Sequence, residues 1–203
     1  IVEQGGNIIF QSFGSYFIYD GKGTKGVRCP ELPLNLFRIG DTLYSQLING
    51  GVCTFAGDKF IPLISRQDLG DSDVLAGLPY PGGMLLLTRN SGGYIHTSSG
   101  SRPWHTDSDE ELKRHTVNRA VMTKDSCYVI GTISNGLYAF SKEGHLLWKE
   151  NADNQLENNT VLGLYCDMDN NIWTALDNGI AYVRNNSLIY HLEPLRPKVG
   201  IVY

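Results

Sequence analysis

The chain has 203 residues and a formal net charge of −4, with 17 Lys and Arg against 21 Asp and Glu. Positive charge is nowhere concentrated, so the chain lacks the basic face with which proteins neutralise nucleic-acid phosphates, and we expect no nucleic-acid contact. Its apolar runs are no longer than residues 84–87, far below the length of a membrane span. The length is sufficient for one all-β domain with a sizeable core.

Short β-like runs separated by turns follow one another along the whole chain. They pair as residues 7–10 with 16–19, 42–44 with 52–55, 84–87 with 94–96, 127–130 with 137–140, and 172–175 with 180–183. Small polar residues followed by Gly51, Gly93, Gly136 or Gly179 separate the two runs of the later pairs. Because glycine accepts the positive φ that tight turns need, each pair is expected to form a hairpin.

One segment occurs three times without a gap, at residues 57–74, 100–117 and 144–161. Each copy has an apolar Ile61, Trp104 or Trp148 at its fifth position, and further on a leucine and then a valine. A period of about 40–50 residues built from short β runs is typical of a β-propeller blade. The fixed place of the three large side chains favours packing over a platform for stacking carbohydrate.

The predicted fold is therefore all-β, a β-propeller of about five four-stranded blades that occupies residues 1–203. The blades are expected to begin near residues 1, 35, 72, 116 and 160. In the last copy the strands are expected at residues 161–165, 172–175, 180–183 and 187–191, with the first innermost and no helix longer than about two turns. Incomplete blades at both ends predict a segment of a larger propeller, seven-bladed or double.

Motifs for catalysis or metal binding are weak. The segment from Asp167 to Asn171 resembles the start of a calcium loop, but it lacks the glycine and the glutamate of that motif, which favours a polar turn. The five histidines have no metal-ligand spacing, and no nucleophile elbow or phosphate loop is present. No catalytic residue, metal ligand or cofactor is predicted.

Cysteine usage leaves the compartment open. Cys53 and Cys127 lie in strands and are expected to be small buried apolar residues. A disulfide between Cys29 and Cys53 is an open alternative.

Polar residues that break the repeat gather in the loops that should meet on one face of a propeller. These loops are the turns between second and third strands and the connections that lead into first strands. The longest of them, residues 107–116, carries an acidic half and a basic half. Such groups could orient a polar ligand through charge-assisted hydrogen bonds. The candidate ligand-binding residues are Arg89, Arg114, His115, Arg119, Asn135, Asn158 and Asn159.

Residues 161–180 resemble the two-component-regulator propeller repeat, in which a V-x-x-I start is followed by Asp, Gly, Leu-Trp, Gly-Thr and a closing Gly-Leu. Asp167, Trp173 and Gly179 match that pattern, whereas Ala175 and Leu176 replace Gly-Thr. The resemblance covers the last two blades well and the first three weakly.

The resemblance implies a periplasmic sensor propeller of a membrane-spanning regulator, such as a hybrid histidine kinase, in which a kinase module would lie elsewhere. It also implies sensing of an oligosaccharide or another small polar ligand, and a homodimer through the whole ectodomain. The segment itself is then not an enzyme. Two alternatives remain: a propeller enzyme of the lyase or glycosidase type, and a scaffold that only dimerises.

Overall fold

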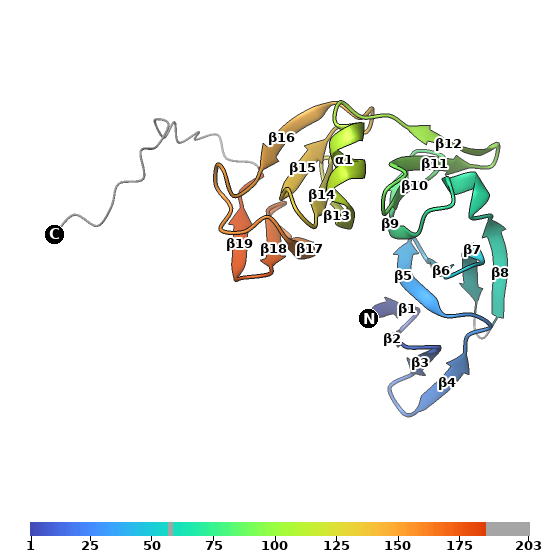
Figure 1. Ribbon diagram of the computed structural model, residues 1–203. Coiled ribbons are helices and arrows are strands. Elements are labelled where there is room, and N and C mark those ends of the chain that lie inside the picture. The colour runs from blue at the N-terminus through green and yellow to red at the C-terminus, as the bar shows by residue number, and fades with distance from the viewer. Residues whose placement is uncertain (57–58, 186–203) are drawn as a thin grey trace.

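A computed structural model describes residues 1–56 and 59–185, and Figure 1 shows their five antiparallel sheets following one another in chain order. We call these sheets blades 1 to 5. The first four blades have four strands each, and three strands are described for blade 5. The strands of blade 1 are β1 (Val2–Gln4), β2 (Asn7–Ser12), β3 (Ser15–Tyr19) and β4 (Thr24–Arg28), and those of blade 2 are β5 (Pro33–Ile39), β6 (Thr42–Leu47), β7 (Gly51–Ala56) and β8 (Lys59–Ile64).

Blade 3 comprises β9 (Val74–Tyr80), β10 (Gly83–Thr88), β11 (Gly93–Thr97) and β12 (Gly100–Trp104). Blade 4 comprises β13 (Val117–Met122), β14 (Tyr128–Thr132), β15 (Leu137–Phe140) and β16 (Leu146–Glu150), and blade 5 has β17 (Val161–Cys166), β18 (Ile172–Leu176) and β19 (Ile180–Val183). The all-β propeller prediction is confirmed. The fourth strand expected at residues 187–191 lies outside the described residues.

The first strand of each blade is innermost. Within each blade the strands pair in sequence order, and the first strands of neighbouring blades contact one another from β1 through β5, β9 and β13 to β17. This order places the hairpins at the two ends of the strands and leaves the fourth strand at the periphery. The predicted strand order of a blade is therefore confirmed.

The core is a series of apolar layers, each lying between two consecutive blades. One layer joins Ile9 and Tyr16 of blade 1 to Leu43 and Phe55 of blade 2, and three further layers follow in the same way. The leucines and valines of the threefold segment all belong to these layers and are buried: Leu69, Leu112, Leu156, Val74, Val117 and Val161. Recurrence of these residues in the sequence therefore reflects packing between blades.

In the strand register Ile61 and Trp148 of the same segment are equivalent, each opposite the third residue after the turn glycine, whereas Trp104 lies opposite the first, contrary to the gapless alignment. Trp104 lies opposite Gly93, Trp148 lies opposite Ala139, and Ile61 lies opposite Thr54. Trp104 is buried, as predicted for a packing residue, and donates its Nε1–H to the Lys142 carbonyl at 2.9 Å. Trp148 packs partly buried between blades 4 and 5.

The packing prediction is wrong for Ile61, whose side chain is exposed. This residue lies on the peripheral strand β8, at the edge of blade 2 where no neighbouring strand covers it. A register shift between the Val52 and Cys53 pairs, which the gapless alignment does not contain, sets where each β8 side chain falls.

Glycine with positive φ closes the predicted hairpin turns, with one shift of register. Gly51, Gly136 and Gly179 have φ values of +69°, +71° and +99°, as the turn chemistry requires. In blade 3 the turn residue is Gly92 at +83°, and Gly93 already begins β11. Thr88 and Thr132 each donate their amide to the glycine at the turn, Gly92 and Gly136, which makes these two glycines equivalent.

Two short helices lie in the connections between blades. A 3-10 turn covers Gln67–Leu69, and α1 covers Asp109–His115, about two turns, within the predicted limit on helix length. Asp109, Glu110 and Glu111 form the first turn of α1, and the basic residues of the expected loop form its last turn, an arrangement that stabilises the helix through its dipole. Leu112 anchors α1 in the core.

The four cysteines are free, so the Cys29–Cys53 disulfide is not formed. Cys53 is buried, as expected, and its thiol hydrogen-bonds the Ser45 carbonyl at 3.3 Å. The expectation is wrong for Cys127, which is only half-buried because it precedes β14 at the end of a surface turn.

Candidate functional site

Backbone hydrogen bonds gather the turns and blade connections on one face, which we call the loop face. In blades 2 to 5 the first residue of the turn between second and third strands donates its amide to the residue that precedes the first strand. The pairs are Ile48 to Leu32, Arg89 to Asp73, Ile133 to Thr116 and Asp177 to Thr160, at 2.8–3.1 Å. The candidate loops therefore lie side by side, in the arrangement expected from the repeat.

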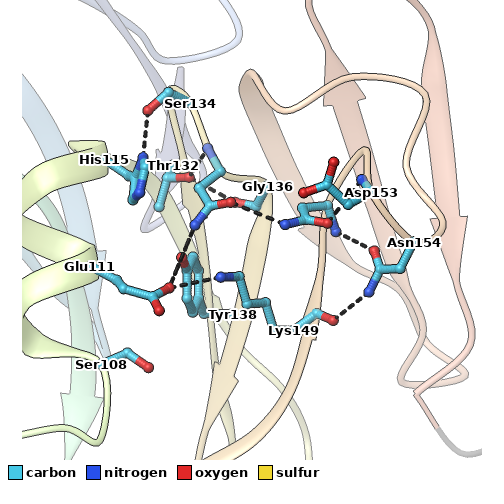
Figure 2. Close-up of polar contacts among 12 residues, drawn as sticks. Ser108, Glu111, His115, Thr132, Ser134, Gly136, Tyr138, Lys149, Asp153 and Asn154 are labelled. Atoms are coloured by element: carbon cyan, nitrogen blue, oxygen red, sulfur yellow. Dashed lines mark hydrogen bonds and ion pairs between the residues drawn. The ribbon is translucent and has the colours of Figure 1, made fainter.

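A charged cluster lies on the loop face where α1 meets blade 4, as Figure 2 shows. Glu111 Oε2 accepts hydrogen bonds from the Tyr138 hydroxyl at 2.6 Å, from Lys149 Nζ at 2.7 Å and from Asn135 Nδ2 at 3.5 Å. Asn135 Oδ1 in turn accepts from Asn151 Nδ2 at 3.1 Å. We call these five residues the Glu111 network.

The electrostatics of the network favour its charged form. The hydrogen bonds from Lys149 and then from Tyr138 lower the pKa of Glu111 below its ordinary value. Burial, reinforced by the neighbouring Glu111, raises the pKa of Tyr138, so the phenol remains a hydrogen-bond donor at neutral pH. Lys149 Nζ also lies 4.9 Å from the centroid of the Tyr138 ring, a cation–π contact.

The network is open to solvent at its ionic end. The side chains of Lys149 and Glu111 are 29% and 45% exposed, so both are partly accessible to solvent. A hydroxyl group of a ligand could accept from the ammonium and donate to the carboxylate. This pairing suits recognition of polar groups.

Three of the candidate residues contact or border this cluster. Asn135 belongs to the network, and the Nδ1 atom of His115 hydrogen-bonds Ser134 Oγ in the next turn at 2.8 Å. The Asn159 carbonyl accepts from the Gly136 amide at 2.9 Å, and its Oδ1 accepts from the Ala152 amide at 2.8 Å.

Arg114 lies on the last turn of α1 with its side chain exposed. Within the described part of the chain it makes no hydrogen bond or ion pair. Its guanidinium is therefore available to an external anion or hydroxyl group.

The other three candidates are occupied elsewhere. Arg89 lies on the turn of blade 3 and pairs with Asp73 at 3.5 Å. Arg119 lies on β13 and donates to the carbonyl of its neighbour Asn118 at 2.7 Å. Asn158 caps a local turn by accepting from the Thr160 amide at 2.7 Å.

Sequence reasoning missed Glu111, Tyr138 and Lys149. In the sequence Glu111 is one of several acidic residues in a row, and Tyr138 is one residue of a β-like run. The ion pair between Glu111 and Lys149 joins positions 38 residues apart. The repeat shows which positions of successive blades are equivalent, but it does not show which side chains contact one another across a blade connection.

The segment that resembles a calcium loop forms a turn, as predicted. Asp167 Oδ1 accepts from the amides of Asp169 and Asn171, both at 2.9 Å, and Asn170 adopts a φ of +66°. Among residues 1–56 and 59–185, no group of three or more His, Cys, Asp or Glu side chains could hold a metal ion. None of the helices described there has the length and hydropathy needed to cross a membrane.

Neither a known protein family nor a curated protein matches the chain by sequence. By structure it is similar to the extracellular domain of the putative one-component system BT4673 from B. thetaiotaomicron, with a TM-score of 0.73 and 18% identity over 92% of this chain and 27% of that one. The extracellular domain of the putative hybrid two-component system BT3049 of that organism gives a TM-score of 0.65 and 16% identity over 95% of this chain and 28% of that one. This chain thus spans about a quarter of those extracellular domains.

Virginiamycin B lyase from Staphylococcus aureus is also similar, with a TM-score of 0.66 and 12% identity over 90% of this chain and 67% of that one. At these identities the likenesses establish the fold. The resemblance that residues 161–180 bear to regulator propellers agrees with the descriptions of the first two structures, and the chain shares the β-propeller fold of those extracellular domains.

Proposed function

We propose that this chain is the extracytoplasmic, ligand-binding propeller of a membrane-spanning signal-transduction regulator, and that it is not itself an enzyme. The observation that carries the proposal is the likeness, over more than nine-tenths of the chain, to extracellular domains of putative one- and two-component systems. A periplasmic location and a homodimer through the whole ectodomain follow as parts of the same proposal.

The ligand would bind at the Glu111 network, beside Arg114. A hydroxyl-rich ligand such as an oligosaccharide can exchange hydrogen bonds with Lys149 and Glu111, and a carboxylated one can pair with Arg114. The network joins α1, which leads into blade 4, to strands within that blade. A ligand that binds one arrangement of these elements better than another shifts the population toward it, which is the minimum requirement for a signal.

Calorimetric titration of the full-length ectodomain with neutral and acidic oligosaccharides tests this proposal. Arg114→Ala should leave the unfolding midpoint unchanged, because the side chain has no partner among the described residues, and should weaken binding about tenfold, the cost of losing one charge-assisted hydrogen bond. Arg102→Ala, which changes an exposed arginine on the peripheral strand β12, is the matched control and should bind normally.

The similarity to virginiamycin B lyase favours one alternative, a propeller enzyme. Chromatography of the same titration mixtures distinguishes the two: an unchanged oligosaccharide that binds supports the sensor, whereas a cleaved product identifies an enzyme. No heat and no product across the whole panel would instead favour a propeller that only mediates dimerisation.

A further inference from the structure

Asparagine followed directly by glycine occurs three times in the chain, each time in the turn between the second and third strands of a blade. The pairs are Asn49-Gly50, Asn135-Gly136 and Asn178-Gly179. An Asn-Gly pair is chemically labile, because glycine has no Cβ to hinder its backbone nitrogen, which can attack the side-chain carbonyl carbon of the asparagine. The structure places the three pairs in different surroundings, so they should differ in reactivity.

Hydrogen bonds hold both reacting groups of the pair in blade 4. Asn135 Oδ1 accepts from Asn151 Nδ2 at 3.1 Å, and Asn135 Nδ2 donates to the Tyr138 hydroxyl. The amide of Gly136 donates to the Asn159 carbonyl at 2.9 Å. An attack of the Gly136 nitrogen on the Asn135 side chain would first have to break these bonds, so this pair should be protected.

The pair in blade 5 is held much less. Asn178 and Gly179 are both exposed, and neither the Asn178 side chain nor the Gly179 amide makes a hydrogen bond within residues 1–56 and 59–185. A Cβ on Gly179 would meet no atom of those residues within 4 Å, so the Asn178 carboxamide has room to turn toward the Gly179 nitrogen. The Gly179 carbonyl accepts from the Leu176 amide at 2.9 Å, a bond that does not involve the reacting atoms.

The pair in blade 2 is intermediate. Asn49 and Gly50 are exposed, but Glu31 Oε2 accepts from the Asn49 amide at 3.1 Å and lies 3.5 Å from the place of a Cβ on Gly50. The attacking amide must lose its proton, and a carboxylate so close opposes the negative charge that develops. Asp177 precedes Asn178, but its exposed carboxylate makes no hydrogen bond with the described residues, and solvent screens it.

We propose that Asn178 is a site of spontaneous covalent modification and the first of the three asparagines to react. The Gly179 nitrogen loses its proton to solvent base and forms a bond to Asn178 Cγ. The Cγ–Nδ2 bond then breaks, and ammonia leaves after it takes a proton from water. Water opens the resulting cyclic imide at either of its carbonyls and leaves a carboxylate at position 178. The net reaction consumes water and releases ammonia, and it needs no oxidant or cofactor.

The modification would change the loop face at the turn of blade 5. It adds a negative charge beside Asp177. When water opens the imide at the carbonyl on the main-chain side, the chain continues through the former side chain and the turn gains a methylene group. The Asp177 amide donates to the Thr160 carbonyl at 3.1 Å, so a longer turn should strain this hydrogen bond. This inference does not depend on the proposed function.

Peptide mass spectrometry of the full-length natural protein, incubated at pH 8, tests the proposal. Conversion of amide to acid should be at least roughly tenfold faster at Asn178 than at Asn135, where hydrogen bonds must break first. Conversion at Asn49 should be slower than at Asn178. Asn178→Gln is the matched variant, because its longer side chain would have to close a larger ring. It should nearly abolish conversion at position 178 and leave the unfolding midpoint unchanged.

The same incubation in urea controls for local sequence. In the unfolded chain Asn135 and Asn178 should react at similar rates, because each is followed by glycine and then by an aliphatic residue. Retention of the full difference in urea would overturn the proposal, since sequence and not structure would then set the order. Conversion that begins at Asn49 or Asn135 in the folded protein, or that does not occur at Asn178, would overturn it as well.

Discussion

At the scale of single residues, two glutamates near the loop face lie in opposite electrostatic surroundings. Glu111 has three hydrogen-bond donors, and two of them, Lys149 and then Tyr138, lower its pKa. Glu150 on β16 has a buried Oε2 atom with no partner among the described residues, and burial raises its pKa. Replacement of each carboxylate by its neutral amide should therefore change stability in opposite directions.

We expect Glu111→Gln to lower the free energy of unfolding by about 1 kcal/mol at pH 7, a value reduced from that of a buried charge-assisted hydrogen bond because the ion pair is partly exposed. A lowered folded-state pKa means that the stabilisation is present above the unfolded pKa and is lost as pH falls through the folded pKa. Urea denaturation at pH 7 and pH 3 measures this. A loss that persists unchanged at pH 3 would contradict the ionic explanation.

Glu150→Gln should instead stabilise the protein at pH 7, by roughly 1 kcal/mol or less, because it removes a charge that burial disfavours. A raised folded-state pKa makes the native state lose stability as pH rises from the unfolded to the folded pKa, so the gain should vanish below the unfolded value. The same denaturation series measures both variants, and a destabilised Glu150→Gln at pH 7 would show that Oε2 has a partner in solution.

At the scale of elements, the hairpin turns and the blade connections fix how strands meet. Gly136 shows why the turn residue is glycine: a Cβ atom there would lie 2.2 Å from the Glu150 carbonyl oxygen, whereas a Cβ on Gly179 would meet no atom of the described residues within 4 Å. Both residues have positive φ. Alanine substitutions at these two glycines therefore distinguish the energetic cost of positive φ from that of a steric clash.

Gly179→Ala should cost about 1–2 kcal/mol, the penalty of positive φ alone. Gly136→Ala should cost at least about 2 kcal/mol more, because the backbone of β16 must move to admit the methyl group. Thermal unfolding of both variants gives the comparison. Equal losses of stability in the two variants would mean that the backbone of β16 moves aside with no cost in folding free energy.

The buried leucine of each blade connection should be an energetic anchor. Leu112→Ala removes the one buried side chain of α1 and should cost about 2–5 kcal/mol. Leu147→Ala, at an exposed position of β16, should cost less than about 0.5 kcal/mol. Chemical denaturation of the two variants checks this, and a loss below 1 kcal/mol for Leu112→Ala would show that α1 does not depend on the core.

The sequence alone predicts the elements that the repeat encodes. Val117 and Val161 recur with the period and prove to pack between blades, and Gly51, Gly136 and Gly179 occupy the turns as expected. The gapless alignment fails for Trp104 and Trp148 because strand bulges such as that between Ala139 and Phe140 shift the register without changing the residue count. Glu111 escapes prediction because a seven-residue helix with one buried leucine leaves no periodic pattern.

At the scale of the whole molecule, stability should vary along the series of blades. Among the described residues each apolar layer joins two consecutive blades, so stability approximates a sum over blades and the layers between them. Blades 2, 3 and 4 have layers on both faces, whereas blades 1 and 5 each have one face that no described residue covers. The middle of the chain should thus open less often than its ends.

Hydrogen exchange of the isolated chain tests this gradient. Amides of β10 and β14 should exchange at least roughly tenfold more slowly than those of β2 and β18, because the latter need only one layer to separate. Uniform protection from β2 to β18 would indicate a single cooperative unit instead.

The hydrogen bonds that link each turn of the loop face to a blade connection join backbone atoms. The amides of Ile48, Arg89, Ile133 and Asp177 donate to the carbonyls of Leu32, Asp73, Thr116 and Thr160. A backbone hydrogen bond of this kind constrains the length and dihedral angles of a loop, but it does not require any particular side chain on the residue that donates. The four donor residues are an isoleucine, an arginine, a second isoleucine and an aspartate. The side chains of this face can therefore change without disturbing the architecture beneath it.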